Sequence, residues 1–329
     1  MKKFINEVDA VENEMVAGLV KAFPRHVRKL DCGNVIVRAE KKTGKVALVS
    51  GGGSGHEPSF GGYVGRGMLD AAVSGAIYTS PAADLIYEAI KAVATEKGVL
   101  LAPMNYTGDI MNFEMAKEMA EAEGIKVEQV VVNDDVAVDN SLYTVGRRGV
   151  AGTVLVHKIA GAKAEAGADL ADVKAVAEKV IANVRTMGVA INPSTIPAAG
   201  KPGFTLAEDE MEVGIGIHGE PGVRKEKLRK ADEIVDTLLE KILADIDCSG
   251  GEVAVLVNGS GGTPLMELLI VNNRVYDVLV SKGIRIYRTF VGNYMTSIEQ
   301  EGFSLSLLKL DDEMKNLLDA AVEAPAMRN

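Results

Sequence analysis

Residues 46–58 read VALVSGGGSGHEP, an apolar β-branched run followed directly by glycines. A short apolar run of this kind predicts a buried strand. The glycines after it predict a loop whose backbone can approach a ligand closely and expose N–H groups to an oxygen-rich partner. Since ligands of α/β sheets gather at loops leaving the carboxyl ends of strands, this stretch predicts both a strand and a ligand-facing loop.

Outward from this stretch, short β-branched runs alternate with helical patterns along the chain. Strands are expected at 34–37, 46–50, 99–103, 127–132, 213–217, 253–257 and 284–288, an edge strand at 303–310, and helices at 4–23, 110–122, 150–166 and 170–187. This alternation predicts an α/β fold with two α/β domains, whose mixed or mainly parallel sheets are covered by helices.

A Gly-, Pro- and Ser-rich stretch near residues 188–193 follows the last of these helices. Because domain boundaries fall in such stretches, we expect an N-terminal α/β domain at 1–188, carrying the glycine-rich loop, and a C-terminal α/β domain at 189–329.

The composition excludes several classes of protein. The 329 residues carry a net charge of −10, and aromatic residues make up only 5% with no Trp, which disfavours a nucleic-acid binder. No apolar run is long enough for a membrane span or a signal peptide. Cys32 and Cys248 stand far apart and the four histidines are scattered, so no metal site is expected. These features predict a soluble cytoplasmic protein.

Three familiar motifs fail at the glycine-rich stretches. Counting G-x-G-x-x-G from Gly51 places His56 at the third glycine, and Gly200-Lys201 lacks the rest of a phosphate-binding P-loop. The nucleophile elbow G-x-S-x-G is also absent around Ser54 and Ser260. The sequence therefore shows no nucleotide-binding loop.

Two histidines stand in glycine-rich loops, each next to a Glu-Pro pair. His56 lies at the tip of the first loop. It is interpreted either as a general base or hydrogen-bond donor that faces a small ligand, or as a histidine that only orders the loop. His218 lies in MEVGIGIHGEPG (211–222), as a neutral imidazole nucleophile or in a turn that serves backbone geometry alone. Both interpretations stay open for each residue, and the shared context favours one common site.

Carboxylates and arginines follow other expected strands. Asp109 in NYTGD (105–109) is interpreted either as a helix N-cap or as a base for a substrate hydroxyl. Asp134 and Asp135 are expected in a solvated turn rather than at a cation. Arg147 and Arg148 are candidates to bind a phosphate or the acidic face of a partner.

A methionine stripe has helical spacing. Met111, Met115 and Met119 recur every four residues and are expected in the core.

Six motifs, in order along the chain, together resemble the dihydroxyacetone kinase K-subunit family. They are GGGSGHEP (51–58), TSP (79–81), NYTGD (105–109), YTVGRRGVA (143–151), PAAGKPGFTL (197–206) and EVGIGIHGEPG (212–222). The resemblance covers essentially the whole chain.

The resemblance implies a homodimer that binds dihydroxyacetone covalently. It implies that a ring nitrogen of His218 adds to the ketone as a hemiaminal, and that His56 and Asp109 serve as acid and base. It also implies that the loop Gly53, Ser54, Gly55 and His56 holds the substrate. A neutral imidazole is nucleophilic near neutral pH, and a C–N bond selects a ketone over glycerol.

The missing nucleotide loop also fits the resemblance. In the family, ADP or ATP and magnesium sit on a separate L subunit, so no cofactor is expected on this chain. The chain resembles the bacterial type, in which phosphate passes from phosphoenolpyruvate through the phosphotransferase carriers and an M subunit to L.

One residue departs from the family pattern. Met104 stands before NYTGD, where the family usually carries a lysine that contacts the substrate. A thioether cannot donate a hydrogen bond, and one lost donor is worth about 1–3 kcal/mol. Two alternatives therefore stay open: a sensor or coactivator paralogue that binds dihydroxyacetone without kinase activity, and a kinase for a related short ketose.

Overall fold

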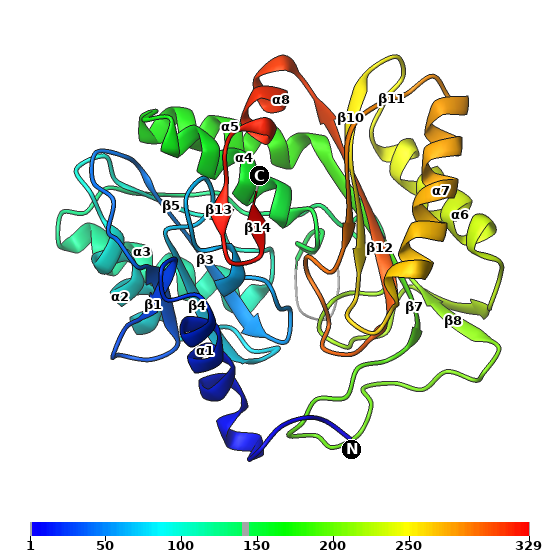
Figure 1. Cartoon of the computed structure of the whole chain (residues 1–329), viewed down its shortest axis with the longest axis horizontal. Helices are drawn as coiled ribbons and strands as arrows, with labels where there is room; N and C mark the ends of the chain where they lie inside the picture. The colour runs from blue at the N-terminus through cyan, green and yellow to red at the C-terminus, as the bar shows by residue number, and fades with distance from the viewer. Residues whose placement is uncertain (1, 140–144, 329) are drawn as a thin grey trace. The chain divides into compact units, whose positions relative to one another are not determined.

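The chain folds into two compact units in a computed structural model that describes residues 2–139 and 145–328 (Figure 1). The first unit contains Lys2–Val132, Val154–Ile181 and the C-terminal segment from Asn316. The second unit contains the described parts of Asn133–Thr153 together with Ala182–Lys315. The units thus interleave along the chain, whereas the expected domains 1–188 and 189–329 are consecutive segments.

The first unit is built on a mixed sheet. Its strands lie in the order β1 (Val27–Lys29), β2 (Val35–Arg38), β4 (Ala71–Ile77), β3 (Ala47–Ser54), β5 (Val99–Leu101) and β6 (Val127–Gln129). β3 runs parallel to both of its neighbours and β5 runs parallel to β6, whereas β2 is antiparallel to β1 and β4. The carboxyl ends of β4, β3 and β5 therefore meet at one edge of the sheet.

Helices pack against this sheet through small and branched side chains. They are α1 (Val11–Ala22), α2 (Ala83–Val93) and α3 (Thr107–Ala122). α4 (Thr153–Glu165) and α5 (Leu170–Asn183) also lie mainly in this unit, and α8 (Asp312–Asp319) begins in the second unit and ends in the first. Short 3-10 turns, η1 (Val8–Ala10) and η2 (Gly61–Tyr63), and the ribbon β13 (Glu323–Ala324) and β14 (Met327–Arg328) complete the described elements of the unit. Ile86 and Ile90 of α2 and Phe113 of α3 are buried in one apolar cluster with the strands.

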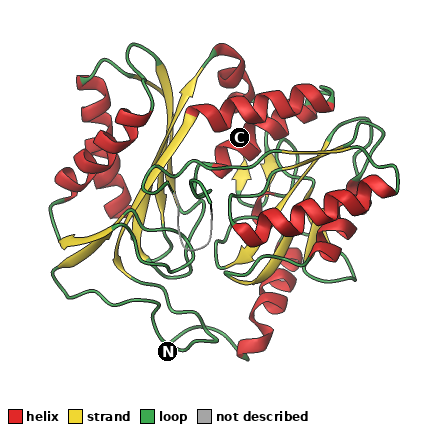
Figure 2. Ribbon diagram, turned by 180° about the vertical axis from the view of Figure 1, so that it is seen from behind, coloured by secondary structure: helices red, strands yellow, loops and turns green. Residues whose placement is uncertain are grey.

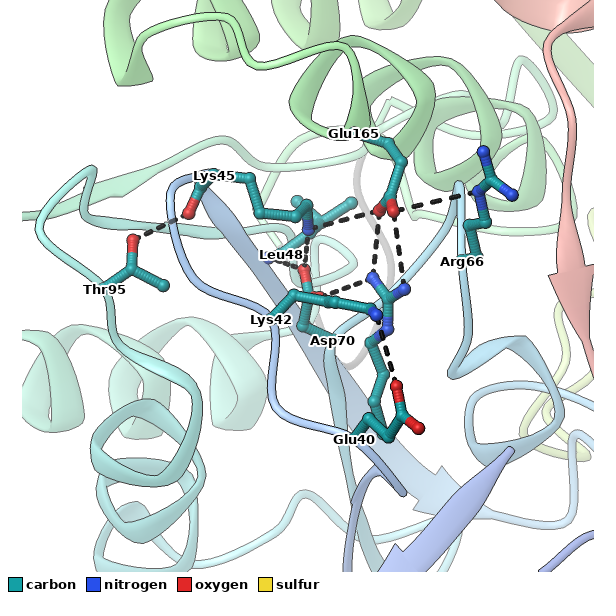
Figure 3. Close-up of polar contacts among 9 residues, drawn as sticks. Glu40, Lys42, Lys45, Leu48, Arg66, Asp70, Thr95 and Glu165 are labelled. Carbon is teal, nitrogen blue, oxygen red and sulfur yellow. Dashed lines mark hydrogen bonds and ion pairs between the residues drawn. The ribbon is translucent and has the colours of Figure 1, made fainter. Parts of the chain in front are cut away.

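A buried ionic cluster also stabilises the first unit (Figure 3). Asp70 accepts hydrogen bonds from Arg38 over 3.0 Å, from Lys45 over 2.5 Å and from the Leu48 N–H over 2.9 Å. Glu165, at the end of α4, accepts from Arg38 over 2.9 Å. Two cations and two carboxylates thus neutralise one another and connect α4 to β2, β3 and the start of β4.

The second unit has a largely antiparallel sheet. Its strands lie in the order β11 (Arg285–Gly292), β10 (Glu252–Gly259), β12 (Glu301–Leu310), β7 (Val184–Asn192), β8 (Glu210–Val213) and β9 (Arg224–Lys227). Only β10 and β11 are paired in parallel among these described strands. α6 (Ala231–Asp245) and α7 (Leu265–Ser281) lie side by side along the sheet and bury Leu238, Leu239 and Val275 (Figures 1 and 2).

The predicted α/β fold with two helix-covered mixed sheets is confirmed, with local corrections. Residues 303–310 were expected at an edge, but β12 pairs with both β10 and β7 inside the sheet. The expected helix 170–187 ends at Asn183, where β7 begins, because Val184 and the residues after it join the sheet. The strand expected at 213–217 is β8, which ends at Val213.

The methionine stripe was wrongly expected in the core. Met111, Met115 and Met119 are 60%, 53% and 36% exposed, whereas Phe113 and Ala116 form the buried face of α3. Periodicity identified the helix, but two faces of α3 carry apolar side chains and the periodicity does not say which one packs.

The helices were compared with the length and apolarity of membrane-spanning helices. Within residues 2–139 and 145–328, no helix combines the length and apolarity that a bilayer crossing requires.

Candidate functional site

His56 and Asp109 lie just beyond the carboxyl ends of two adjacent parallel strands. His56 follows β3, and Asp109 lies a few residues beyond β5, in the first turn of α3. The strand-to-loop pattern in the sequence predicted this placement, because parallel neighbours end at the same edge.

His56 is held flat against an aromatic ring. It is fully buried, and its ring stacks on Tyr78 with centroids 5.3 Å apart and an interplanar angle of 21°. Tyr78 adopts a left-handed φ of 57°, and its N–H donates to the Ser54 carbonyl over 3.0 Å. A strained backbone of this kind persists where the surrounding structure requires it, which supports a functional role for the loop.

Asp109 has the features of a general base. It is 2% exposed, and the Ser80 side chain hydrogen-bonds to it. Its Oδ1 has no hydrogen-bond partner among the residues that the structure describes. Burial raises the pKa of Asp109 to about 7, against the opposing effect of the Ser80 bond. The helix-cap alternative is wrong, because the N-cap of α3 is Tyr106 and Asp109 is already helical.

The segment after β4 connects the two loops, and sequence reasoning missed this role. Ser80 contacts Gly108, where an added Cβ would lie 2.7 Å from its Oγ. At Gly53 an added Cβ would lie 2.6 Å from the Thr79 nitrogen, so only glycine fits there. The available signal was the TSP motif itself, which the sequence analysis quoted but to which it assigned no role.

The other predicted substrate-loop residues lie close by. Ser54 is buried and donates to the Gly75 carbonyl over 2.7 Å, while the Gly55 N–H donates to Glu57 over 3.2 Å. Met104 is fully buried, and its Cε lies 3.8 Å from where a Cβ on Gly52 would stand. Met104 thus borders the glycine loop, and the Ser54 hydroxyl already bonds to β4.

His218 belongs to the second unit, in the loop between β8 and β9. Its backbone N–H donates to Glu220 Oε2 over 2.8 Å. The ring is partly exposed, yet desolvation, together with the positive charge of Arg148, lowers the pKa of His218 to about 3. The imidazole is therefore neutral at physiological pH, as a nucleophile requires.

The expectations for the acidic and basic pairs need correction. Asp134 and Asp135 were expected in a solvated turn, but they are 0% and 1% exposed. Asp134 accepts the N–H groups of Val150 and Gly152, both over 2.8 Å. Asp135 accepts a hydrogen bond from the buried Arg148 over 2.7 Å. These partners are not visible in the local sequence, which is why a solvated turn was expected.

The two arginines have different partners. Arg147 donates to Asp245 of α6 over 2.8 Å and is partly exposed, whereas Arg148 is 1% exposed and fully enclosed by acceptors. Arg148 is therefore not available to a phosphate or to an acidic surface.

A metal centre is not apparent in the part of the chain that the structure describes. No three His, Cys, Asp or Glu side chains there are grouped as metal ligands.

Comparisons with known proteins agree over the whole chain. The Dak1 domain model matches residues 17–326. The dihydroxyacetone-binding subunit of PTS-dependent dihydroxyacetone kinase 1 from Listeria innocua is 56% identical over 95% of both chains. The structure matches the dihydroxyacetone kinase operon co-activator with a TM-score of 0.91 at 37% identity, covering 98% of each chain. It matches the dihydroxyacetone kinase of C. freundii with a TM-score of 0.89 at 34% identity, covering 99% of this chain and 60% of that one.

Proposed function

Because the chain belongs to the Dak1 family, we propose that it is the dihydroxyacetone-binding subunit of a phosphotransferase-dependent dihydroxyacetone kinase. Its curated relatives include such subunits and the human triokinase/FMN cyclase, and these similarities support the proposal of a kinase subunit. The observation that carries the proposal is Asp109, a buried carboxylate whose Oδ1 has no hydrogen-bond partner among the described residues, at the sheet edge to which His56 also belongs.

The first step in this proposal forms a covalent adduct. The lone pair of a His218 ring nitrogen attacks the ketone carbon, and the C=O π electrons move to the oxygen. The imidazole then loses its N–H proton while the alkoxide gains one, which leaves a neutral hemiaminal. The low pKa of His218 supports this step, because a protonated ring has no lone pair to donate.

The second step transfers the phosphoryl group. Asp109 accepts the proton of the substrate's terminal hydroxyl as that oxygen attacks the terminal phosphorus of ATP on the partner subunit, and ADP leaves as the old P–O bond breaks. His56 acts as acid and base at the carbonyl. A carboxyl with a pKa of about 7 is well matched to this role, because it is partly ionised and still basic at neutral pH. Gly53, Ser54 and Gly55 hold the substrate through their backbone groups, and the anchored hydroxyl needs little further alignment.

The phosphate donor is assigned to a partner. ADP or ATP with Mg²⁺ is expected on an L subunit, which an M subunit recharges from phosphoenolpyruvate. A homodimer of this chain in the cytoplasm, acting in glycerol metabolism, completes the proposal.

A second candidate function is a dihydroxyacetone sensor. It is favoured by the similarity to the operon co-activator and by Met104 in place of a donor. A kinase for a related short ketose is the remaining alternative, and a substrate panel separates it from the first proposal.

The test combines adduct detection with turnover. The protein is incubated with dihydroxyacetone and analysed by intact-protein mass spectrometry, and phosphorylation is assayed with L and M subunits. The proposal expects an added mass of one dihydroxyacetone that His218→Ala abolishes, together with turnover. An adduct without turnover supports the sensor, and an adduct that persists in His218→Ala contradicts the role of His218.

A further inference from the structure

The loop that carries His218 rests on a buried ionic network. The carboxylate of Glu220 accepts the His218 N–H over 2.8 Å with one oxygen and Arg148 Nη1 over 3.2 Å with the other. Arg148 and Glu220 are 1% and 6% exposed. Each oxygen of the carboxylate therefore has its own partner, one in the loop and one beneath it.

Arg148 also donates to two other acceptors in the second unit. Its Nε donates to Asp135 over 2.7 Å, and its Nη2 donates to the Gly214 carbonyl over 2.8 Å. The guanidinium thus contacts both ends of the segment 214–220, through the Gly214 carbonyl and the Glu220 carboxylate. A planar guanidinium can bind several acceptors at fixed angles, which an ammonium cannot.

The sequence of the loop fits around this pair. At Gly216 an added Cβ would lie 1.7 Å from Glu220 Oε1 and 2.8 Å from Arg148 Nη1. Gly216 therefore leaves the space in which the two charges meet. A loop needed only for a turn would not require a bare backbone over an ion pair.

We infer that Arg148 and Glu220 are positioning residues for His218: they fix the backbone of its loop and place a positive charge near its ring. The inference rests on the proposed function for the covalent step. It goes further by assigning the reactivity of His218 to a buried pair that lies on two different segments of the second unit.

The electrostatic part depends on the balance of nearby charges. Arg148 is the positive group, and it opposes protonation of the ring. Asp135, after β6, and Glu220, in the loop, are the carboxylates bound to Arg148, and Glu212 of β8 is a further buried carboxylate. Removing Arg148 would leave Asp135 and Glu220 without their shared cation, which favours protonation of His218.

The experiment compares three variants with a matched control. Arg148→Lys keeps the positive charge but loses the planar guanidinium that binds several acceptors, and Arg148→Met removes both. In Glu220→Gln, only one of the two terminal side-chain atoms can accept a hydrogen bond. The control is Arg147→Gln, since Arg147 is the neighbouring arginine but pairs with Asp245. Folding of each full-length variant is checked by thermal denaturation.

Adduct affinity is measured by intact-protein mass spectrometry over a dihydroxyacetone titration. Arg148→Lys and Glu220→Gln are expected to weaken the adduct by about tenfold or more, the equivalent of one charge-assisted hydrogen bond. Arg147→Gln is expected to match the parent protein. Equal affinity in all variants, or an equal loss in the control, would overturn the inference.

The protonation state of His218 gives a readout that needs no substrate. In ¹³C-histidine NMR, the signal of His218 is assigned by its loss in His218→Ala. The chemical shift is expected to remain that of a neutral ring down to about pH 5 in the parent and in Arg148→Lys. In folded Arg148→Met it is expected to titrate at a higher pH than in the parent, because desolvation remains but the opposing charge is gone, and an unchanged titration would overturn the electrostatic part. If the parent forms no adduct, the proposed function fails, while this titration still decides the inference.

Discussion

Ser80 donates a hydrogen bond to the carboxylate of Asp109, whereas Oδ1 of the same carboxylate has no partner among the described residues. The hydrogen bond from Ser80 orients the side chain, and Oδ1 is available to accept a proton. A carboxylate bonded on both oxygens would be a weaker base, since hydrogen bonds to the charged form lower its pKa.

Asp109→Asn is expected to stop phosphorylation while leaving adduct formation intact. It is also expected to stabilise the protein at pH 8 but not at pH 4. Because burial raises the pKa of Asp109 to about 7, the folded state binds more protons than the unfolded state between about pH 4 and 7. Stability of the parent therefore falls as pH rises through this window, and the amide removes that loss.

Denaturation midpoints across this pH range test the stability effect, which is expected to be a few kcal/mol. The exposed Asp172, in the first turn of α5, provides the control variant Asp172→Asn. A stability difference independent of pH would contradict the raised pKa.

Ser80→Ala is expected to shift the pH–rate profile of phosphorylation to higher pH. The Ser80 bond lowers the pKa of Asp109, so its loss raises that pKa further and leaves less carboxylate at a given pH. The rate is measured from pH 6 to 9 with L and M subunits. Thr79→Ala is the control, because Thr79 is the exposed neighbour of Ser80 and its hydroxyl donates to the Ile77 carbonyl. A profile that moves equally in both variants would sink this role for Ser80.

Met104→Lys is expected to tighten dihydroxyacetone binding by about tenfold and to destabilise the ligand-free protein. Met104 is fully buried beside Gly52, so the new ammonium would reach the glycine loop but would be desolvated without substrate. Calorimetric titration and thermal denaturation measure the two effects, with Met104→Leu as the apolar control. Unchanged affinity would mean that the substrate does not approach this position.

Asp70→Asn is expected to destabilise the protein by about 3–5 kcal/mol, as for other broken buried ion pairs. Asp70 accepts hydrogen bonds from Arg38 and Lys45, both of which are less than a tenth exposed. Water therefore cannot solvate these two cations once the carboxylate is removed. Urea denaturation measures the change. Asp169→Asn, which breaks the exposed pair with Lys97, is expected to have little effect. Similar losses in the two variants would show that burial does not decide the strength of the cluster.

Gly216→Ala is expected to destabilise the second unit and to weaken the adduct, because a Cβ cannot fit 1.7 Å from Glu220 Oε1. Gly18→Ala in α1, where an added Cβ would have no atom within 4 Å apart from its chain neighbours and the backbone of the helix itself, is expected to be neutral or stabilising by up to about 1 kcal/mol. Denaturation and adduct titration are measured for both. A Gly216→Ala protein as stable as the parent would mean that the loop tolerates displacement of Glu220.

Local pattern was sufficient for much of the fold. The β-branched runs at 46–50 and 253–257 and the helical spacing at 110–122 correspond to β3, β10 and α3. Glycine-rich ends of strands pointed to His56, and order along the chain, compared with a known family, pointed to Asp109 and His218. These features depend on neighbours in sequence, which is why they could be predicted.

The sequence by itself determined where most strands and helices form, and it singled out His56, Asp109 and His218 as candidates for the chemistry. Tertiary structure alone decided that Met111 faces solvent, that β12 is an interior strand, and that Ser80 contacts Asp109. It also decided that Arg148, rather than Arg147, supports the loop of His218. The reason is physical: burial and charge balance depend on residues that are distant in sequence, and no local pattern encodes which of them meet.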